Sequence, residues 1–382
     1  MGNGFHWINM RFNFGEYSTT VYISEELPAI HELALNLGIK ENFKPLIIAD
    51  ENTFYLAKNI CGGADFPICT LKSGEENKNW HSIETILAAA LKAGLGRDCV
   101  FIAVGGGVIG DLTGFAASIY MRGCRFVLVS TTLLGMVDAS VGGKTGFDLF
   151  EIKNLAGSFY PALSVYLPVN ALLSLPEKEW KSGMAELIKT AILAGGDFLE
   201  QIKMNKEQLN KEQRIKNNEQ LSENKEQGNI IKGFIERAVA FKGSIVSEDF
   251  RETENGKRKL LNLGHTFGHA FESAAGLGLV SHGEAVAWGI VQACKLGVKL
   301  GITPHSRAEN IFNLIEAFGY ESAAPHPLAD NADALFTAMG SDKKKRNGKI
   351  TFIIPNEISA CPVTLESDSE LNILKNILNG TI

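Results

Sequence analysis

The stretch VFIAVGGGVIGD (100–111) decides the fold. An apolar, β-rich run ends in Gly105-x-Gly107-x-x-Gly110, and the residues that follow can open a helix. Glycines at such a turn let the backbone approach a pyrophosphate, which then lies on the amides and the positive end of the helix. The alternative is a tight strand-to-helix turn that binds no ligand. Because the next strand closes with Ser-Thr-Thr (130–132) rather than an acidic residue, a dinucleotide would not lie in the standard Rossmann manner.

The segments on either side of this stretch have a similar character. KPLIIAD (44–50) and RFVLVSTT (125–132) are compact apolar runs, and WHSIETILAAALKAG (80–94) has helical periodicity. Continuous apolar strands with helical crossovers predict a mostly parallel sheet covered on both faces. Beyond Pro168 the strand signals fade and long amphipathic segments follow. We therefore predict a Rossmann-like α/β nucleotide-binding domain over 1–167 and a mainly α-helical domain over 168–382.

The overall composition excludes several classes of protein. No apolar run reaches the roughly eighteen residues that a membrane span needs, and a formal charge of −6 disfavours general nucleic-acid binding. The six cysteines are scattered without C-x-x-C spacing, which indicates reduced thiols, and the first residues lack an export signal. We expect a cytoplasmic protein. The polar segment 203–229 contains three copies of Lys-Glu-Gln. We predict that it is a solvated helix or mobile loop with no catalytic or binding residues.

Charged residues cluster in MVDASVGGKTG (136–146) and EIKN (151–154). Asp138, Lys144 and Asn154 fall within seventeen residues of one another. The spacing of a nucleoside-triphosphate P-loop is not met, which disfavours a kinase or ATPase. A lysine beside flexible glycines suits an anionic ligand, but solvated surface lysines would have the same pattern.

Three of the eight histidines fall within eighteen residues. His265 and His269, in NLGHTFGH, would share one face of a helix and could meet a metal, a substrate or only the core. A zinc protease is excluded because Thr266 stands where H-E-x-x-H has its glutamate. His265 and His282 with a carboxylate such as Glu186 would make a three-ligand metal site. Packed core histidines and an ordinary helix carboxylate remain the alternative.

Ten stretches occur in the order found in the 3-dehydroquinate synthases of the sugar-phosphate cyclase superfamily, and the chain resembles that family over nearly its whole length. They are SGEENK, GGGVIGDLTGF, YMRG, STTLLGMVDASVGGKTG, KNLAGSFY, LPEKEW, SGMAELIK, LLNLGHTFGHAFE, HGEAVAWG and DKKKRNG. The family's fold, a nucleotide domain followed by a helical domain, agrees with the division predicted above.

The resemblance implies roles for particular residues. Zinc, for which cobalt could substitute, would be held by Glu186, His265 and His282. Catalytic roles would fall to His269, Glu254, Lys144 and Asp138. Substrate contacts would come from Arg122, Asn154, Lys189, Lys242, Arg258, Asn262 and Lys343. NAD would contact Asp50, Asn52, Glu75, Lys78, Gly106, Gly107, Val108, Asp111, Thr131, Thr132 and Lys153.

This sequence departs from the family pattern in two places. DFRETENGKR (249–258) has two extra residues and Phe250 in place of an acid, whereas Glu254 and Arg258 keep their spacing to His265. Gly-Met (135–136) replaces the more usual Ala-Gln.

The implied reaction converts 3-deoxy-D-arabino-heptulosonate 7-phosphate into 3-dehydroquinate and phosphate. It comprises transient oxidation by NAD, phosphate elimination, reduction and an intramolecular aldol closure, with zinc as Lewis acid. Three alternatives remain: another sugar-phosphate cyclase of the 2-deoxy-scyllo-inosose or valiolone type, a metal-dependent polyol dehydrogenase, and a non-catalytic NAD-binding regulator. The 3-dehydroquinate synthase reaction is favoured over these alternatives by four residues expected near the substrate carboxylate: Arg122, Asn154, Arg258 and Asn262. A homodimer is expected.

Overall fold

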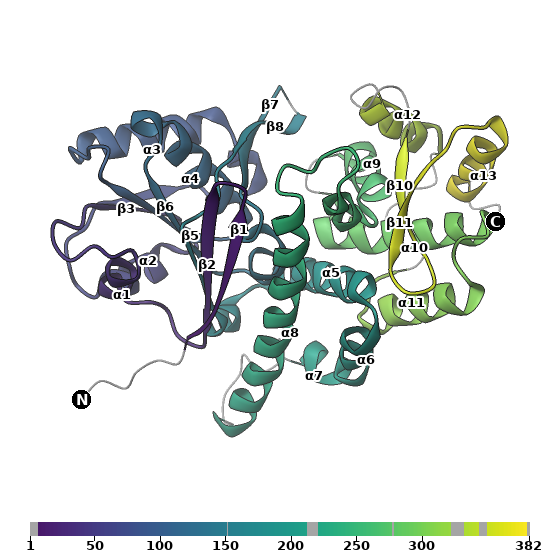
Figure 1. The fold of residues 1–382 in the computed structure, drawn as a ribbon, viewed down its shortest axis with the longest axis horizontal. Helices are drawn as coiled ribbons and strands as arrows, with labels where there is room; N and C mark the ends of the chain where they lie inside the picture. The colour runs from purple at the N-terminus through teal and green to yellow at the C-terminus, as the bar shows by residue number, and fades with distance from the viewer. Residues whose placement is uncertain are drawn as a thin grey trace. The chain divides into compact units, whose positions relative to one another are not determined.

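The structure is a computed structural model, described here for residues 7–150, 152–211, 221–276, 279–321, 332–343 and 350–379 (Figure 1). Contacts divide the chain into two compact units. One is Met1–Trp180 with Lys216–Arg251, and the other is Lys181–Ile215 with Glu252–Ile382. This division is discontinuous, whereas the sequence predicts a continuous split at residue 168. The predicted boundary stays a prediction.

A seven-stranded sheet forms the centre of the first unit, in the order β1-β2-β9-β6-β5-β3-β4. The strands are β1 (Ile8–Phe14), β2 (Tyr17–Ser24), β3 (Pro45–Asp50), β4 (Ile68–Leu71), β5 (Val100–Gly105), β6 (Arg125–Ser130) and β9 (Ser164–Pro168). All neighbours are parallel except the hairpin β1–β2. Every residue of β5 is buried, because helices cover both faces. The predicted fold class is confirmed.

Helices and short turns complete the first unit. The helices are α1 (Ile30–Asn36), α2 (Phe54–Cys61), α3 (Trp80–Lys92), α4 (Gly107–Ile119) and α8 (Leu221–Glu248). The 3-10 turns are η1 (Glu75–Asn77), η2 (Tyr120–Arg122) and η4 (Val169–Ser174), and a π-helical turn is η3 (Gly135–Ala139). A separate hairpin joins β7 (Lys144–Leu149) to β8 (Ile152–Phe159). The predicted strand-to-helix turn lies between β5 and α4.

The aromatic substitution at residue 250 is explained by packing. The Phe250 ring stacks on Phe14 with ring centres 5.7 Å apart, and it meets the edge of Phe159 at 5.3 Å. Phe250 is 9% exposed. A phenylalanine side chain suits this aromatic cluster, because an apolar ring can be buried without the desolvation cost of a carboxylate.

The second unit is mainly helical. Its helices are α5 (Glu177–Ala194, whose first residues belong to the first unit), α6 (Gly196–Met204), α7 (Lys206–Lys211), η6 (Lys257–Asn262), α9 (His265–Ala275), α10 (His282–Lys299), α11 (His305–Ala317), α12 (Ala332–Lys343) and α13 (Asp368–Leu378). A hairpin of β10 (Thr351–Pro355) and β11 (Ala360–Thr364) packs on α10. Helix α10 is buried over most of its length.

Two predictions about segments can be compared with these elements. The polar segment 203–229 is helical over α7 and at the start of α8, and its residues 212–220 lie outside the described part of the chain. Within the described residues, no helix combines the length and apolar character needed to cross a membrane.

Candidate functional site

Glu186, His265 and His282 come together in the second unit. Glu186 lies on α5, and the two histidines are the first residues of α9 and α10. One ligand atom of each residue lies within 4.8 Å of the other two. Among the described residues, this is the group of histidine and carboxylate side chains that could hold a metal ion. Glu186 Oε1 is 3.1 Å from His282 Nε2 and 3.5 Å from His265 Nε2. Two ligands bound at about 2.1 Å to a tetrahedral ion lie roughly 3.4 Å apart, so the spacing and the donor set fit zinc.

The two imidazoles present the same nitrogen to this group. His265 Nδ1 lies 3.1 Å from the Leu263 carbonyl oxygen, which can only accept a hydrogen bond. Nδ1 therefore carries the proton, and the lone pair of Nε2 faces Glu186. His282 also turns Nε2 toward Glu186, and its Nδ1 lies at an ion-pair distance of 3.8 Å from Glu272 Oε1. Sequence reasoning missed Glu272, although it lies two helical turns after His265 on the same face of α9.

Buried charges set the protonation states. Burial alone raises the pKa of Glu186, but Lys189 and both histidines outweigh it and hold the pKa well below its usual range. Burial, followed by the Lys189 charge, lowers the pKa of His265 to about 3. Burial also lowers the pKa of His282, but hydrogen bonds to Glu186 and Glu272 prevail and raise it to about 10. A metal would find Glu186 and His265 in their ligand forms and would have to displace one proton from His282.

Two glycines allow the backbones of α5, α9 and α10 to come into close contact. Gly264 precedes α9 at φ +80°, and a Cβ there would collide with the Val286 carbonyl oxygen of α10. A Cβ on Gly283 would collide with Ser182 Cα of α5. These close approaches bring the first residues of α9 and α10 next to Glu186.

His269 lies one helical turn after His265 but outside the ligand group. Its ring centre is 5.2 Å from that of His265 and 6.4 Å from that of His282. The side chain is exposed, whereas Glu186 is fully buried. The arrangement therefore places His269 beside the Glu186, His265 and His282 group but not within it.

The other predicted residues of the second unit have varied surroundings. The Lys189 ammonium, 1% exposed, forms an ion pair with Glu186. Arg258 is buried on η6, and Asn262 Nδ2 donates to Glu252 Oε1 at 2.7 Å. Glu254 is exposed. Lys343 ends α12, and its side chain lies outside the described ones.

In the first unit, Lys78 joins two groups of predicted contacts. Its buried ammonium lies 2.7 Å from Asp111 Oδ2 and donates to Asn154 Oδ1 at 2.6 Å. Burial lowers the pKa of Lys78, but Asp111 and Glu75 outweigh it, so the pKa is raised and the charge is kept. Two predicted NAD contacts and one predicted substrate contact thus form one network.

Asp148 extends this network, and sequence reasoning missed it. Its Oδ1 accepts from the Asn154 backbone N–H at 2.7 Å, and its own N–H donates to the Lys78 carbonyl at 2.7 Å. Asn154 adopts φ +54°. No motif marks Asp148, because the contact depends on how the hairpin β7–β8 folds back.

The remaining predicted NAD contacts lie at the carboxyl ends of the strands and at the start of α4. Asp50 ends β3 and caps the next turn, with Oδ1 accepting from the Asn52 N–H at 3.0 Å. Thr131 N donates to the Gly105 carbonyl at 2.9 Å, and Thr132 Oγ1 accepts from Gly135 N at 3.0 Å. Gly106 caps α4. Gly107 and Val108 form the first turn of α4. Glu75 lies in η1, and Lys153 is exposed in β8.

Two predicted residues of the first unit lie at irregular backbone. Asp138 is in the π-helical turn η3 and pairs with Lys242 of α8 at 2.6 Å. Arg122 has φ +69° and directly follows Met121 at φ +51°. Successive left-handed residues without glycine are strained, and such strain is concentrated at functional sites.

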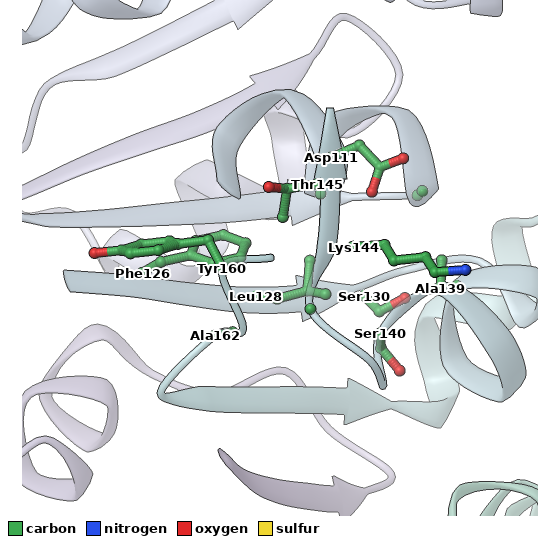
Figure 2. A pocket seen from close by; sticks show the side chains of 15 residues that line it. Asp111, Phe126, Leu128, Ser130, Ala139, Ser140, Lys144, Thr145, Tyr160 and Ala162 are labelled. Atoms are coloured by element: carbon green, nitrogen blue, oxygen red, sulfur yellow. The ribbon is translucent and has the colours of Figure 1, made fainter. Parts of the chain in front are cut away.

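The first unit contains an open hollow, and Figure 2 shows side chains that line it. Its lining consists of Gly106, Gly107, Gly110, Asp111, Phe126, Leu128, Ser130, Gly135, Ala139, Ser140, Gly143, Lys144, Thr145, Tyr160 and Ala162. The start of α4, with its free amides, therefore forms part of the wall, and Lys144 adds a cation suited to an anionic ligand.

Comparisons with known proteins cover both units. The family model for the 3-dehydroquinate synthase N-terminal domain matches residues 68–182, and the C-terminal model matches 183–345. A 3-dehydroquinate synthase of Prochlorococcus marinus is 36% identical over 92% of this chain and 93% of its own length. One of Shewanella frigidimarina is 35% identical over 97% and 99%.

Solved structures of related cyclases share the fold. A 2-deoxy-scyllo-inosose synthase superposes with a TM-score of 0.79 at 22% identity, covering 98% of this chain and 99% of the other. The 2-epi-5-epi-valiolone synthase of Streptomyces hygroscopicus, solved with NAD⁺ and Zn²⁺, has a TM-score of 0.79 at 23% identity, covering 98% and 100%. A probable glycerol dehydrogenase of Sinorhizobium meliloti is more distant, with a TM-score of 0.61 at 14% identity over 97% and 99%.

The sequence relatives decide between these possibilities, because their identity extends over nearly the whole chain, whereas the cyclase structures share the fold alone. The resemblance drawn from the ten motifs is confirmed: this chain belongs to the 3-dehydroquinate synthase family.

Proposed function

We propose that this chain converts 3-deoxy-D-arabino-heptulosonate 7-phosphate into 3-dehydroquinate and phosphate, using NAD and a divalent metal held by Glu186, His265 and His282. The observation that carries the proposal is the Glu-His-His group, in which three ligand atoms lie within 4.8 Å. Zinc is the proposed ion, with cobalt as a substitute. Bound together, NAD would supply a reversible hydride acceptor and the metal a Lewis acid at the alcohol that is oxidised.

The protein's own residues would orient an anionic substrate and neutralise its charge. The heptulosonate carries a carboxylate and a phosphate, and charge-assisted hydrogen bonds from cations are the strong contacts to such groups. The proposed contacts are Arg122, Lys144, Asn154, Lys189, Lys242, Arg258, Asn262 and Lys343. Local cations of this kind explain how a chain with a formal charge of −6 could bind a polyanion.

Proton transfer would be assigned to residues outside the metal group. His269 is exposed one turn from His265, at a position from which its imidazole could accept or return a proton. Asp138, held by Lys242 at 2.6 Å, and Glu254 are further proposed participants. For NAD, we propose the eleven contacts named above, from Asp50 to Lys153.

One assay tests this proposal. The purified chain, given the heptulosonate phosphate, NAD⁺ and zinc, is expected to release phosphate continuously while NADH stays near zero, because each turnover returns the hydride. Stoichiometric accumulation of NADH would indicate a polyol dehydrogenase. Turnover of a different sugar phosphate alone would indicate another cyclase. NAD binding without turnover of any substrate would indicate a regulator.

We also propose that the protein is a cytoplasmic homodimer. The scattered, reduced cysteines support the location. Sedimentation analysis of the purified chain tests the dimer, and a mass of one chain over the working concentration range would contradict it.

A further inference from the structure

Ser130 has a buried hydroxyl to which the described part of the chain offers no hydrogen bond. It ends β6 and is 1% exposed, and its Oγ finds no hydrogen-bond partner among the described residues. A buried polar group without a partner costs free energy, so such a group in a native protein calls for an explanation. Ser130 was absent from the residues that the sequence singled out.

The surroundings of Ser130 indicate what could satisfy it. Its side chain lines the hollow of Figure 2, together with Gly106, Gly107 and Lys144. Ser130 pairs in register with Gly105, and the next residue, Thr131, bonds to the Gly105 carbonyl. The hydroxyl therefore lies at the carboxyl end of a parallel sheet, beside a glycine turn and the first amides of a helix. Dinucleotides bind in such places.

Gly135 gives a second, independent indication that the hydroxyl belongs where it is. A Cβ on Gly135 would lie closer to Ser130 Oγ than atoms can approach, and 3.0 Å from Thr132 Oγ1. The alanine that is more usual in the family at this position is therefore incompatible with the Ser130 hydroxyl as placed. Gly135, which also lines the hollow, leaves room for it.

We propose that the Ser130 hydroxyl donates a hydrogen bond to an oxygen of bound NAD, and that Gly135 is required to keep it in place. The proposal rests on the proposed function, because it assigns NAD to the first unit. A hydroxyl donor suits an oxygen of the pyrophosphate or of the nicotinamide carboxamide equally well.

The central test is Ser130→Ala, measured in two ways on the purified chain. In the NAD-free protein the substitution removes an unsatisfied group and breaks no protein hydrogen bond, so Tm should not fall. The Kd for NAD⁺, from isothermal titration calorimetry, should rise about threefold to tenfold if the acceptor is the neutral carboxamide oxygen, and roughly tenfold to a hundredfold if it is a charged pyrophosphate oxygen. A lower Tm would reveal a partner within the protein, and an unchanged Kd would assign the hydroxyl to water. Either result overturns the proposal.

Thr113→Val is the matched control. Thr113 Oγ1 is also buried and without a partner among the described residues, but it does not line the hollow. Its substitution should leave the Kd for NAD⁺ unchanged. An equal loss of affinity in Thr113→Val would mean that any change in this core weakens binding, which would overturn the proposal.

Two further measurements sharpen the result. ADP-ribose lacks the nicotinamide, so a weakened Kd for both ligands in Ser130→Ala identifies a pyrophosphate oxygen, and a change for NAD⁺ alone identifies the carboxamide. Gly135→Ala should lower Tm, and Ser130→Ala in the same chain should partly restore it, because the next Ser130 atom, Cβ, is 3.6 Å away. Failure of that rescue would remove Gly135 from the proposal.

These outcomes are distinct from failure of the proposed function. If the unmodified chain bound no NAD⁺ and released no phosphate, the proposed function would fail and the inference with it. If the unmodified chain bound NAD⁺ and Ser130→Ala bound it equally well, only the inference would fail.

Discussion

The two units hold candidate sites that are built in different ways. In the first, the wall of the hollow combines the glycine turn at the start of α4 with residues of β6, η3 and β7 and of the segment before β9. In the second, the metal group consists of side chains from three helices, and Glu186 is separated from His282 by 96 residues. A local glycine spacing therefore encodes part of the first site, whereas the second depends entirely on how helices pack.

The two sites also differ in what keeps them intact. The metal group is buried, and its carboxylate is stabilised by Lys189 and the histidines together. Removing one member leaves an uncompensated buried charge, which is costly. Around the hollow, apart from the ion pair between Lys78 and Asp111, the contacts are single hydrogen bonds, each worth far less. Substitutions should therefore have their largest effects in the second unit, and the following predictions test that order.

The largest effect is expected for Glu186→Ala and His282→Ala. Each removes one of three metal ligands, so bound zinc, measured by atomic emission, should fall sharply. Activity should fall roughly a thousandfold or more, because a Lewis acid supplies several kcal/mol of transition-state stabilisation. Glu309→Ala, at an exposed position on α11, is the control, and this variant should keep its zinc content and its activity. Full zinc occupancy in either variant would remove that residue from the ligand set.

The sequence could predict the fold better than the metal group. Buried apolar runs such as VFIAVG predict parallel strands without any knowledge of partners, and the glycine turn after β5 was predicted where it lies. The hairpins β7–β8 and β10–β11 were not, because their strands are partly exposed or short. The placement of α8 in the first unit depends on packing against β1 and η3, which periodicity cannot reveal.

For the site, helical spacing pointed to His265 and His269 as one pair. In the structure, His265 instead lies with His282 and Glu186 in the group that could hold a metal ion. The reason is that α9 and α10 meet at Gly264, which brings their first residues together. The motif resemblance implied this set, whereas spacing alone left it open. The contacts of Glu272 with His282 and of Asp148 with Asn154 join different elements, so no motif marked these residues.

The second prediction separates the two histidines of NLGHTFGH. His265→Ala should lose zinc, whereas His269→Ala should retain zinc and NAD binding because His269 lies outside the ligand group. Its turnover should nevertheless fall on the order of a hundredfold or more, the usual effect of removing a positioned proton-transfer group. Zinc analysis and kcat of both variants check this. Loss of metal from His269→Ala with retention in His265→Ala would reverse the assignment.

The third prediction concerns the carboxylate behind His282. Glu272→Ala removes the group that lies 3.8 Å from His282 Nδ1 and orients the ring. Zinc affinity, measured by chelator competition, should weaken about tenfold to a hundredfold, as for other residues that support metal-bound histidines. Glu272→Gln keeps an oxygen acceptor and should lose less. Equal zinc affinity in the unmodified chain and Glu272→Ala would show that His282 needs no such support.

The smallest effect should come from the first unit, at Asp148. Asp148→Ala removes the acceptor of the Asn154 backbone N–H, while the Lys78 bond to the Asn154 side chain remains. The Asn154 oxygen must face Lys78, which has no acceptor, so the amide NH₂ is the group left to face a ligand. Asp148 would act by holding that orientation at φ +54°.

Loss of one such hydrogen bond should lower kcat/KM about threefold to tenfold, mainly through KM. Asp148→Asn keeps an oxygen acceptor and should behave nearly as the unmodified chain does, whereas a purely electrostatic role would make it as poor as Asp148→Ala. A double-mutant cycle is decisive. If Asp148 works only through Asn154, Asp148→Ala should have no further effect on kcat/KM in a chain that already carries Asn154→Ala. Additive losses would show that the two residues act separately, and that even this open site depends on more than local backbone.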